Sequence, residues 1–286
     1  MCRCLAAYDA LPPLSPPLTD RDDIYFELLA SSLRVCADYK PKFGTGGDAG
    51  LTRAQFQIRY GADPFYRWVG LDSPLIYAAH KAAGGMTSIY RQLGIGGERL
   101  FRQVIRDQLD LDADQATWAY TVPGQGGKDR TLTLDGRIQF EDIADGDARR
   151  RVERWAGGVA QELELDPAFT SDMRGVVFEV RQGYKSADAK RQNADVANAS
   201  NAYANLYVPS LALLSTQINE TVSTRYVAAR WLLLTGTTDG TPTDSTYVFC
   251  REILGYDLAA FFERSSDRFK ALLEAVVASL LTPGDD

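Results

Sequence analysis

Two short apolar segments with a helix-length stretch between them constrain the fold of this chain more than any other feature. Residues 208–215 are almost entirely apolar, and Trp231-Leu232-Leu233-Leu234 repeats that character after a predicted helix at about 217–229. Such runs are typical of buried strands. A strand, a helix and a second strand in this order pair in parallel, because a parallel connection needs a long crossover. The sequence therefore predicts a sheet with helical crossovers.

Alternating apolar and polar residues predict further strands upstream. Residues 117–122 and 131–140 form a β-hairpin around a turn with three glycines, and Asp135 lies on the polar face of the second strand. Residues 175–182 form the next strand, with Glu179 on its polar face. These strands belong to a mixed sheet.

Helical periodicity fills most of the remaining chain. We predict helices at about 22–39, 52–59, 74–92, from Gly96 onward, 147–164, 186–205 and along the amphipathic C-terminal segment. The expected fold class is α/β, a mixed central β-sheet flanked by helices with a helical N-terminal section. Residues 1–93 form that section and pack on a core of residues 94–286, as one continuous domain.

Composition excludes several classes of protein. The 286 residues are 45% hydrophobic and 24% charged, as in ordinary globular proteins. The 31 Lys and Arg against 38 Asp and Glu give a net charge of −7, which argues against one broad basic surface but not against local basic patches. His80 is the single histidine, so a Cys/His zinc site is disfavoured. No apolar run reaches the ~18–20 residues of a membrane span, and we expect a soluble, cytoplasmic protein.

Acidic residues stand at positions that the predicted fold brings together. Glu98 begins a predicted helix, Asp135 and Glu179 lie on strands, and the cations Arg181 and Lys185 follow Glu179 closely. Two or three carboxylates that converge at one sheet edge can bind a hard divalent cation, with substrate phosphate completing the ligands of Mg²⁺. A metal bound there polarises a phosphoryl oxygen and lowers the pKa of a bound water.

Over residues 95–236 the order of elements and the Asp…Glu-x-(Lys) pattern resemble the PD-(D/E)XK nuclease superfamily, specifically its Type II restriction endonucleases. In this resemblance Asp135 matches the first acid, Glu179 the second, and Glu98 the helix acid that some members add. It implies a restriction-endonuclease-like core that uses Mg²⁺ to hydrolyse phosphodiester bonds of double-stranded DNA in a sequence-specific way. It also implies a homodimer that reads a palindrome, with a cognate DNA methyltransferase as genetic partner.

The sequence departs from the family pattern in three ways, one of which is the long separation of Asp135 from Glu179. No Pro precedes Asp135, and Arg181 stands where the family has Lys, so Lys185 is a second candidate for that role. Arginine cannot deprotonate, which leaves Arg181 to orient groups and stabilise charge. Asp172 is a rival for the first acid. With Asp135 as the first acid, the resemblance implies that Asp135, Glu179 and Glu98 are the metal ligands.

The segment after Glu179 is a candidate DNA-binding surface. Its cations, hydroxyl and amides suit phosphates and base edges; the candidates are Lys185, Ser186, Lys190, Arg191, Gln192 and Asn193. The competing interpretation is a solvated helix start capped by Ser186. Arg149-Arg150-Arg151 and Arg154 either track the DNA backbone or form a solvated face.

Three further functions remain open at this point, the last of them a soluble enzyme of another chemistry in which the acidic residues on two strands are a chance feature. The first is a repair or phage-defence nuclease without strict site specificity. The second is a non-catalytic DNA-binding or regulatory protein on the same fold.

Overall fold

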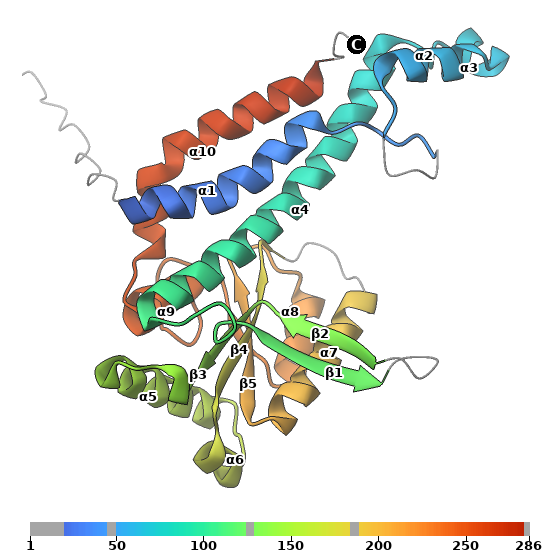
Figure 1. Ribbon diagram of the computed structural model, residues 1–286. Helices are drawn as coiled ribbons and strands as arrows, with labels where there is room; N and C mark the ends of the chain where they lie inside the picture. Colours follow the sequence, from blue (N-terminus) through green and yellow to red (C-terminus); the bar gives the residue numbers. More distant parts are fainter. Residues whose placement is uncertain (1–19, 45–49, 124–128, 184–188, 283–286) are drawn as a thin grey trace, which may run out of the picture.

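The computed structural model describes residues 20–44, 50–123, 129–183 and 189–282, and these residues form a sheet-bearing part and a helical part that share one long helix (Figure 1). Within those ranges the side chains of residues 20, 122, 123, 130 and 189–196 are outside the description. Along the described chain, no helix is both long and apolar enough to cross a membrane.

The central sheet has four strands in the order β3-β4-β5-β6. The strands are β3 (Gly136–Gln139), β4 (Gly175–Arg181), β5 (Tyr207–Leu213) and β6 (Leu232–Leu234). β3 runs antiparallel to β4, whereas β4, β5 and β6 are parallel. Helix α8 (Glu220–Ala228) connects β5 to β6. The mixed sheet and the parallel strand–helix–strand unit predicted from the apolar segments are thus confirmed.

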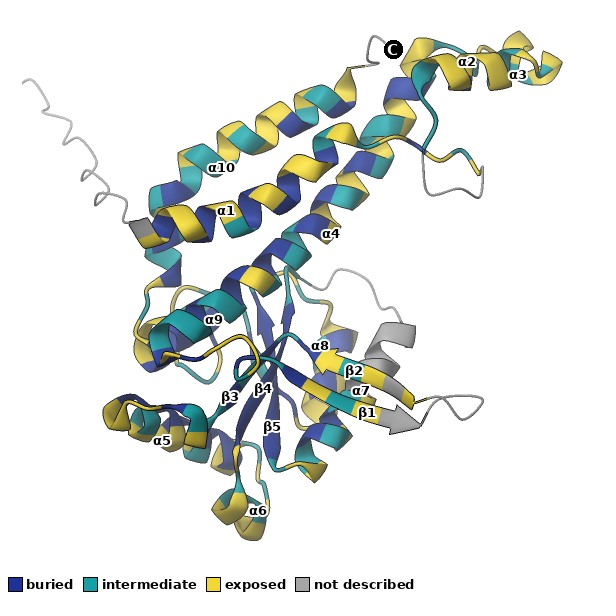
Figure 2. Cartoon of the chain, in the orientation of Figure 1, coloured by how far each residue is buried: buried dark blue, intermediate teal, exposed yellow. Residues whose placement is uncertain are grey.

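Helices cover both faces of this sheet, and the central strands are buried (Figure 2). On β4, Val176, Phe178 and Val180 belong to one apolar cluster and Val177 to another, because successive side chains point to opposite faces. The first cluster includes residues of α4 (Pro74–Leu109), α5 (Gly146–Glu162), α9 (Thr246–Phe249) and the π-helical turn η4 (Cys250–Leu254). The second includes residues of α7 (Ala189–Ala204), α8 and the hairpin.

The predicted hairpin is present, but its second strand is shorter than expected. β1 (Trp118–Pro123) pairs antiparallel with β2 (Asp129–Leu134), and the chain bends at Asp135 before β3 begins. Leu134 packs in the cluster on one face of the central sheet and Ile138 in the cluster on the other. In an uninterrupted strand these even-numbered residues would share a face. The bend therefore moves the chain from the hairpin into the central sheet.

The helices predicted at 74–92 and from Gly96 onward are one continuous helix, α4, of 36 residues. It begins where the Ser73 hydroxyl accepts a hydrogen bond from the N–H of Ile76 (3.3 Å) and ends at Asp110, whose backbone is left-handed (φ 53°). Two of the glycines that suggested a helix start, Gly96 and Gly97, serve close packing instead. A Cβ at Gly96 would lie 2.7 Å from Leu29 Cδ1 and 3.0 Å from Leu29 Cα.

Three helices form the second part of the molecule (Figure 1). α10 (Leu258–Leu281) lies beside α1 (Asp20–Arg34) and α4. Asp22 is fully buried at this junction, where both its oxygens accept hydrogen bonds from the Arg264 guanidinium (2.9 and 3.0 Å). The expected boundary at residues 93 and 94 falls inside α4, and the C-terminal helix assigned to the core packs on the N-terminal helices.

Several short elements complete the description. They are η1 (Val35–Asp38), α2 (Arg53–Gly61), α3 (Pro64–Trp68), η3 (Phe140–Asp142) and α6 (Pro167–Asp172). α2 and α3 lie at the end of α4 that is remote from the sheet (Figure 1).

Candidate active site

Asp135 lies at the bend between the hairpin and the central sheet. Gly136, the first residue of β3, pairs with Phe178 of β4 in an antiparallel register. Continuing this register by one residue puts Asp135 opposite Glu179. Its Oδ2 accepts a hydrogen bond from the backbone N–H of Val180 (2.8 Å). Strand pairing therefore brings together two acids that are far apart in the sequence.

Glu179 and Arg181 occupy alternate positions at the end of β4 and share one face of the strand. The Glu179 side chain is buried, and its Oε1 forms an ion pair with Nη2 of Arg181. The other terminal nitrogen of Arg181, Nη1, lies 3.9 Å from Asp135 Oδ2. The Arg181 guanidinium thus stands between the two carboxylates.

Glu98 approaches the same place from α4. One turn further along this helix, Arg102 donates from Nη2 to Glu98 Oε1 (2.8 Å) and from Nε to the backbone oxygen of Asp135 (2.6 Å). Arg102 therefore ties the helix acid to the bend that carries Asp135. The sequence analysis did not single out Arg102, although the Glu98–Arg102 spacing of i and i+4 on a helix is a recognisable ion-pair pattern.

The electrostatics of Asp135 reflect this crowding of charges. Burial raises the pKa of its carboxyl from 3.8 to about 6, and the negative charge of Glu98 adds to the rise. The Val180 N–H and the positive charges of Arg181 and Arg102 act in the opposite direction but do not cancel it. A carboxyl with a pKa near 6 changes charge just below neutral pH, which is typical of groups at functional sites.

A groove of about 460 Å³ gives solvent access to this cluster. Its walls are α4 on one side and the end of β4 on the other, and they include Glu98 and Arg181. Asp135 and Glu179 do not line this groove themselves, but both contact Arg181, which does. A phosphate that enters the groove would meet the carboxylate of Glu98 and the guanidinium of Arg181 first.

The site offers a divalent cation a pair of carboxylate ligands rather than a set of three. Among the residues that the structure describes, no group of three or more His, Cys, Asp and Glu side chains is arranged to hold a metal ion. Glu179 pairs with Arg181 and Glu98 pairs with Arg102, and the charges of Asp135 and Glu98 are close enough to interact. Mg²⁺ needs only one or two protein carboxylates besides water and phosphate, and Asp135 together with Glu98 can supply that pair.

Asp172, the rival for the first acid, is remote from this site. It is exposed at the end of α6, before the first residue of β4, whereas Glu179 and Arg181 lie near the last. A strand rises about 3.3 Å per residue, so roughly 20 Å separates the two ends of β4. The geometry selects Asp135.

The candidate DNA-binding segment lies largely outside the described residues. Lys185 and Ser186 are not described. Lys190, Arg191, Gln192 and Asn193 fall in α7, and nothing is described of their side chains. Their proposed roles stay predictions.

Three of the four arginines of α5 are engaged with the protein itself, whereas Arg154 is exposed. Arg149 donates to the backbone oxygen of Glu141 (2.7 Å), Arg150 pairs with Asp147, and Arg151 donates to the backbone oxygen of Ile253 (2.7 Å). These contacts favour the structural interpretation of this charge run over the DNA-tracking one.

Comparisons with protein-family models, with curated proteins and with solved structures found no match to this chain. The functional argument therefore depends on the geometry of the site.

Proposed function

We propose that this protein is a Mg²⁺-dependent, sequence-specific endonuclease of double-stranded DNA, similar to Type II restriction enzymes. The observation that carries the proposal is the convergence of Glu98, Asp135, Glu179 and Arg181 at one end of a mixed sheet. These residues come from α4, from the bend before β3 and from β4. Homodimerisation, a partner methyltransferase and a cytoplasmic location belong to the same proposal.

Each side chain has a distinct role in this mechanism. Asp135 and Glu98 would hold Mg²⁺, which when bound polarises a phosphoryl oxygen and lowers the pKa of a bound water. Arg181 binds the scissile phosphate and offsets its growing negative charge, but it cannot act as a base. Glu179 fixes the orientation of Arg181 through their ion pair. Lys185 would assist the attacking water from beyond Gly183.

Arg102 acts as a positioning residue in this scheme. Its guanidinium holds the Glu98 carboxylate and the backbone of Asp135 at the same time. Pairing with Arg102 restricts the rotamers of the Glu98 carboxylate.

The decisive experiment compares single substitutions on plasmid and phage DNA, with and without Mg²⁺. Asp135→Asn and Glu179→Gln should abolish cleavage while DNA binding in Ca²⁺ is kept. Asp172→Asn, an exposed carboxylate at the other end of β4, is the matched control and should cleave normally. Full activity of either site variant would exclude the assignment. Discrete bands indicate a sequence-specific cutter, whereas a smear indicates a repair or defence nuclease.

One observation favours a non-catalytic alternative, a DNA-binding or regulatory protein on the same fold. Arg181 replaces the family Lys and pairs with Glu179, so this position lacks a group that can lose a proton. A gel shift in Ca²⁺ without any product in Mg²⁺ would support this alternative.

A further inference from the structure

A second and larger groove continues from the candidate active site along α4. It has a volume of about 1230 Å³ and lies between η1, the loop after it, the start of α2 and α4. Thr87 and Arg91 of α4 line both this groove and the smaller one that contains Glu98 and Arg181. The two grooves therefore meet at these residues and form one path over the surface of the helix.

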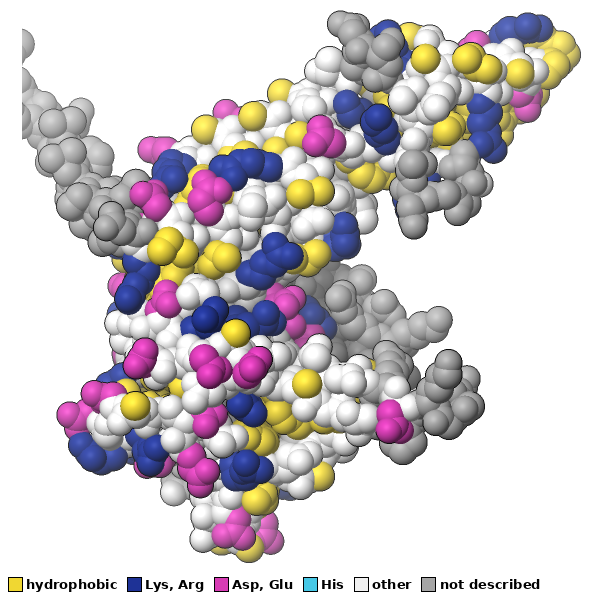
Figure 3. Space-filling view, viewed as in Figure 1, with side chains coloured by type: hydrophobic (Ala, Val, Ile, Leu, Met, Phe, Trp, Pro, Cys, Tyr) yellow, Lys and Arg dark blue, Asp and Glu magenta, His cyan; other side chains and the backbone are white. Residues whose placement is uncertain are grey.

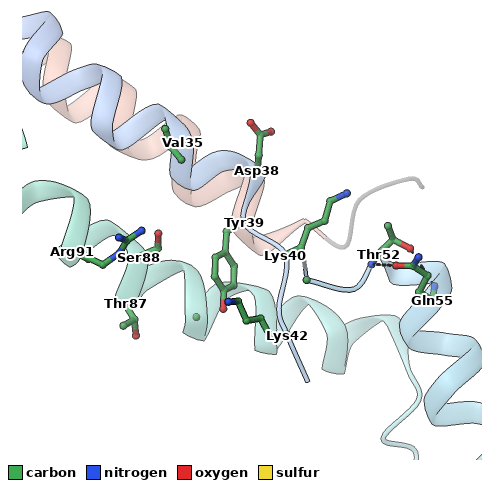
Figure 4. Close-up of a pocket in the computed structure, with 12 residues that line it drawn as sticks. Val35, Asp38, Tyr39, Lys40, Lys42, Thr52, Gln55, Thr87, Ser88 and Arg91 are labelled. Carbon is green, nitrogen blue, oxygen red and sulfur yellow. Dashed lines mark hydrogen bonds between the residues drawn. The ribbon is translucent and has the colours of Figure 1, made fainter. Parts of the chain in front are cut away.

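The larger groove is basic in a chain that is acidic overall. Among its described lining residues the charged ones are Lys40, Lys42 and Arg91, against one acid, Asp38, and all four are exposed. Lys40 and Lys42 extend from the loop after η1, and Arg91 extends from α4 (Figure 4). Against the chain's net charge of −7, this concentration of positive charge marks a surface suited to a polyanion.

The length of this path can be compared with the spacing of phosphates along a DNA strand. The lining of both grooves runs along α4 from Gly84 to Glu98. A helix rises about 1.5 Å per residue, so this stretch is about 20 Å long. Successive phosphates of one DNA strand are about 3.4 Å apart along the duplex axis, so the stretch matches roughly six base pairs. Figure 3 shows Lys and Arg side chains interspersed with Asp and Glu side chains on the face of the molecule that it draws; within the stretch from Gly84 to Glu98, the cation on α4 is Arg91.

We propose that this groove, lined by Lys40, Lys42 and Arg91, binds the sugar–phosphate backbone of the DNA strand that leads into the candidate active site. The inference depends on the proposed function and extends it to the helical part of the chain. Lysine and arginine at the groove walls neutralise phosphates, whereas the Thr87 and Ser88 hydroxyls, which also line it, can donate hydrogen bonds to phosphate oxygens. Contacts to the backbone position the duplex but carry no sequence information.

The test measures DNA binding separately from cleavage. Fluorescence anisotropy with a labelled duplex in Ca²⁺ compares the wild type with the triple variant Lys40→Gln/Lys42→Gln/Arg91→Gln over a series of salt concentrations. Removing three phosphate contacts should weaken binding at least tenfold and reduce the slope of log K against log[salt] by about 3.

A second triple variant controls for net charge. The variant Arg59→Gln/Arg67→Gln/Lys270→Gln also removes three positive charges, but from exposed positions outside both grooves. It should bind DNA with an affinity and a salt slope close to those of the wild type. Thermal melting of both variants checks that each is folded.

The outcomes separate this inference from the proposed function. If the groove variant binds like the wild type while Glu179→Gln still abolishes cleavage, the groove inference is wrong and the nuclease assignment stands. If the groove variant and the control lose affinity equally, overall charge and not the groove is responsible, and the inference fails.

Discussion

Substitution of Asp135 by Asn should stabilise the folded protein at neutral pH and have little effect near pH 4. The pKa of the buried carboxyl is about 6 in the folded protein, against 3.8 for the ordinary group. The folded state therefore binds this proton more tightly than the unfolded state does. The stability that this group contributes is fully present below about pH 4 and is lost as the pH rises through 6.

The magnitude follows from the size of the shift. A rise of about two pKa units corresponds to about 3 kcal/mol, since each unit is worth about 1.4 kcal/mol. Between pH 4 and pH 7, the free energy of unfolding of Asp135→Asn should therefore rise by roughly 2 kcal/mol relative to that of the wild type. The Asn side chain keeps an oxygen that can accept the hydrogen bond from the N–H of Val180.

Urea unfolding followed by tryptophan fluorescence at several pH values measures this difference. Asp172→Asn, an exposed carboxylate, provides the baseline. A stability gap between Asp135→Asn and the wild type that is independent of pH, or that shrinks as the pH rises, would refute the reasoning. Mg²⁺ should also stabilise the wild type more than Asp135→Asn above pH 6, because the cation binds the ionised carboxylate.

Three further predictions test the packing and the site. Gly96→Ala should destabilise the fold by about 1–3 kcal/mol in thermal melts, because its Cβ would press on the backbone of α1; Gly94→Ala, where the same atom meets open space, should be neutral or stabilising. Asp22→Asn should cost about 3–5 kcal/mol in urea unfolding, because it breaks a buried ion pair, whereas Asp23→Asn at an exposed pair should cost less than about 1 kcal/mol. Arg102→Gln should lower kcat of DNA cleavage about 10- to 100-fold with little change in KM, and equal effects on both would contradict a positioning role.

Much of the fold could be predicted because strand and helix patterns are local. The apolar runs at 208–215 and 231–234, with helical periodicity between them, predict the unit that β5, α8 and β6 form. The same reasoning failed at Gly94-Ile95-Gly96-Gly97, since a glycine cluster can serve a turn or a close helix contact. Only the position of Leu29 against Gly96 decides between the two.

The sequence by itself determined which residues are available for chemistry, since the alternation on β4 puts Glu179 and Arg181 on one face. Only the tertiary structure decided how they are used. The antiparallel register of β3 and β4 puts Asp135, and not Asp172, beside Glu179. The crossing of α4 adds Glu98 and Arg102. Such contacts join residues far apart in the chain, and they depend on register and packing, which local periodicity does not encode.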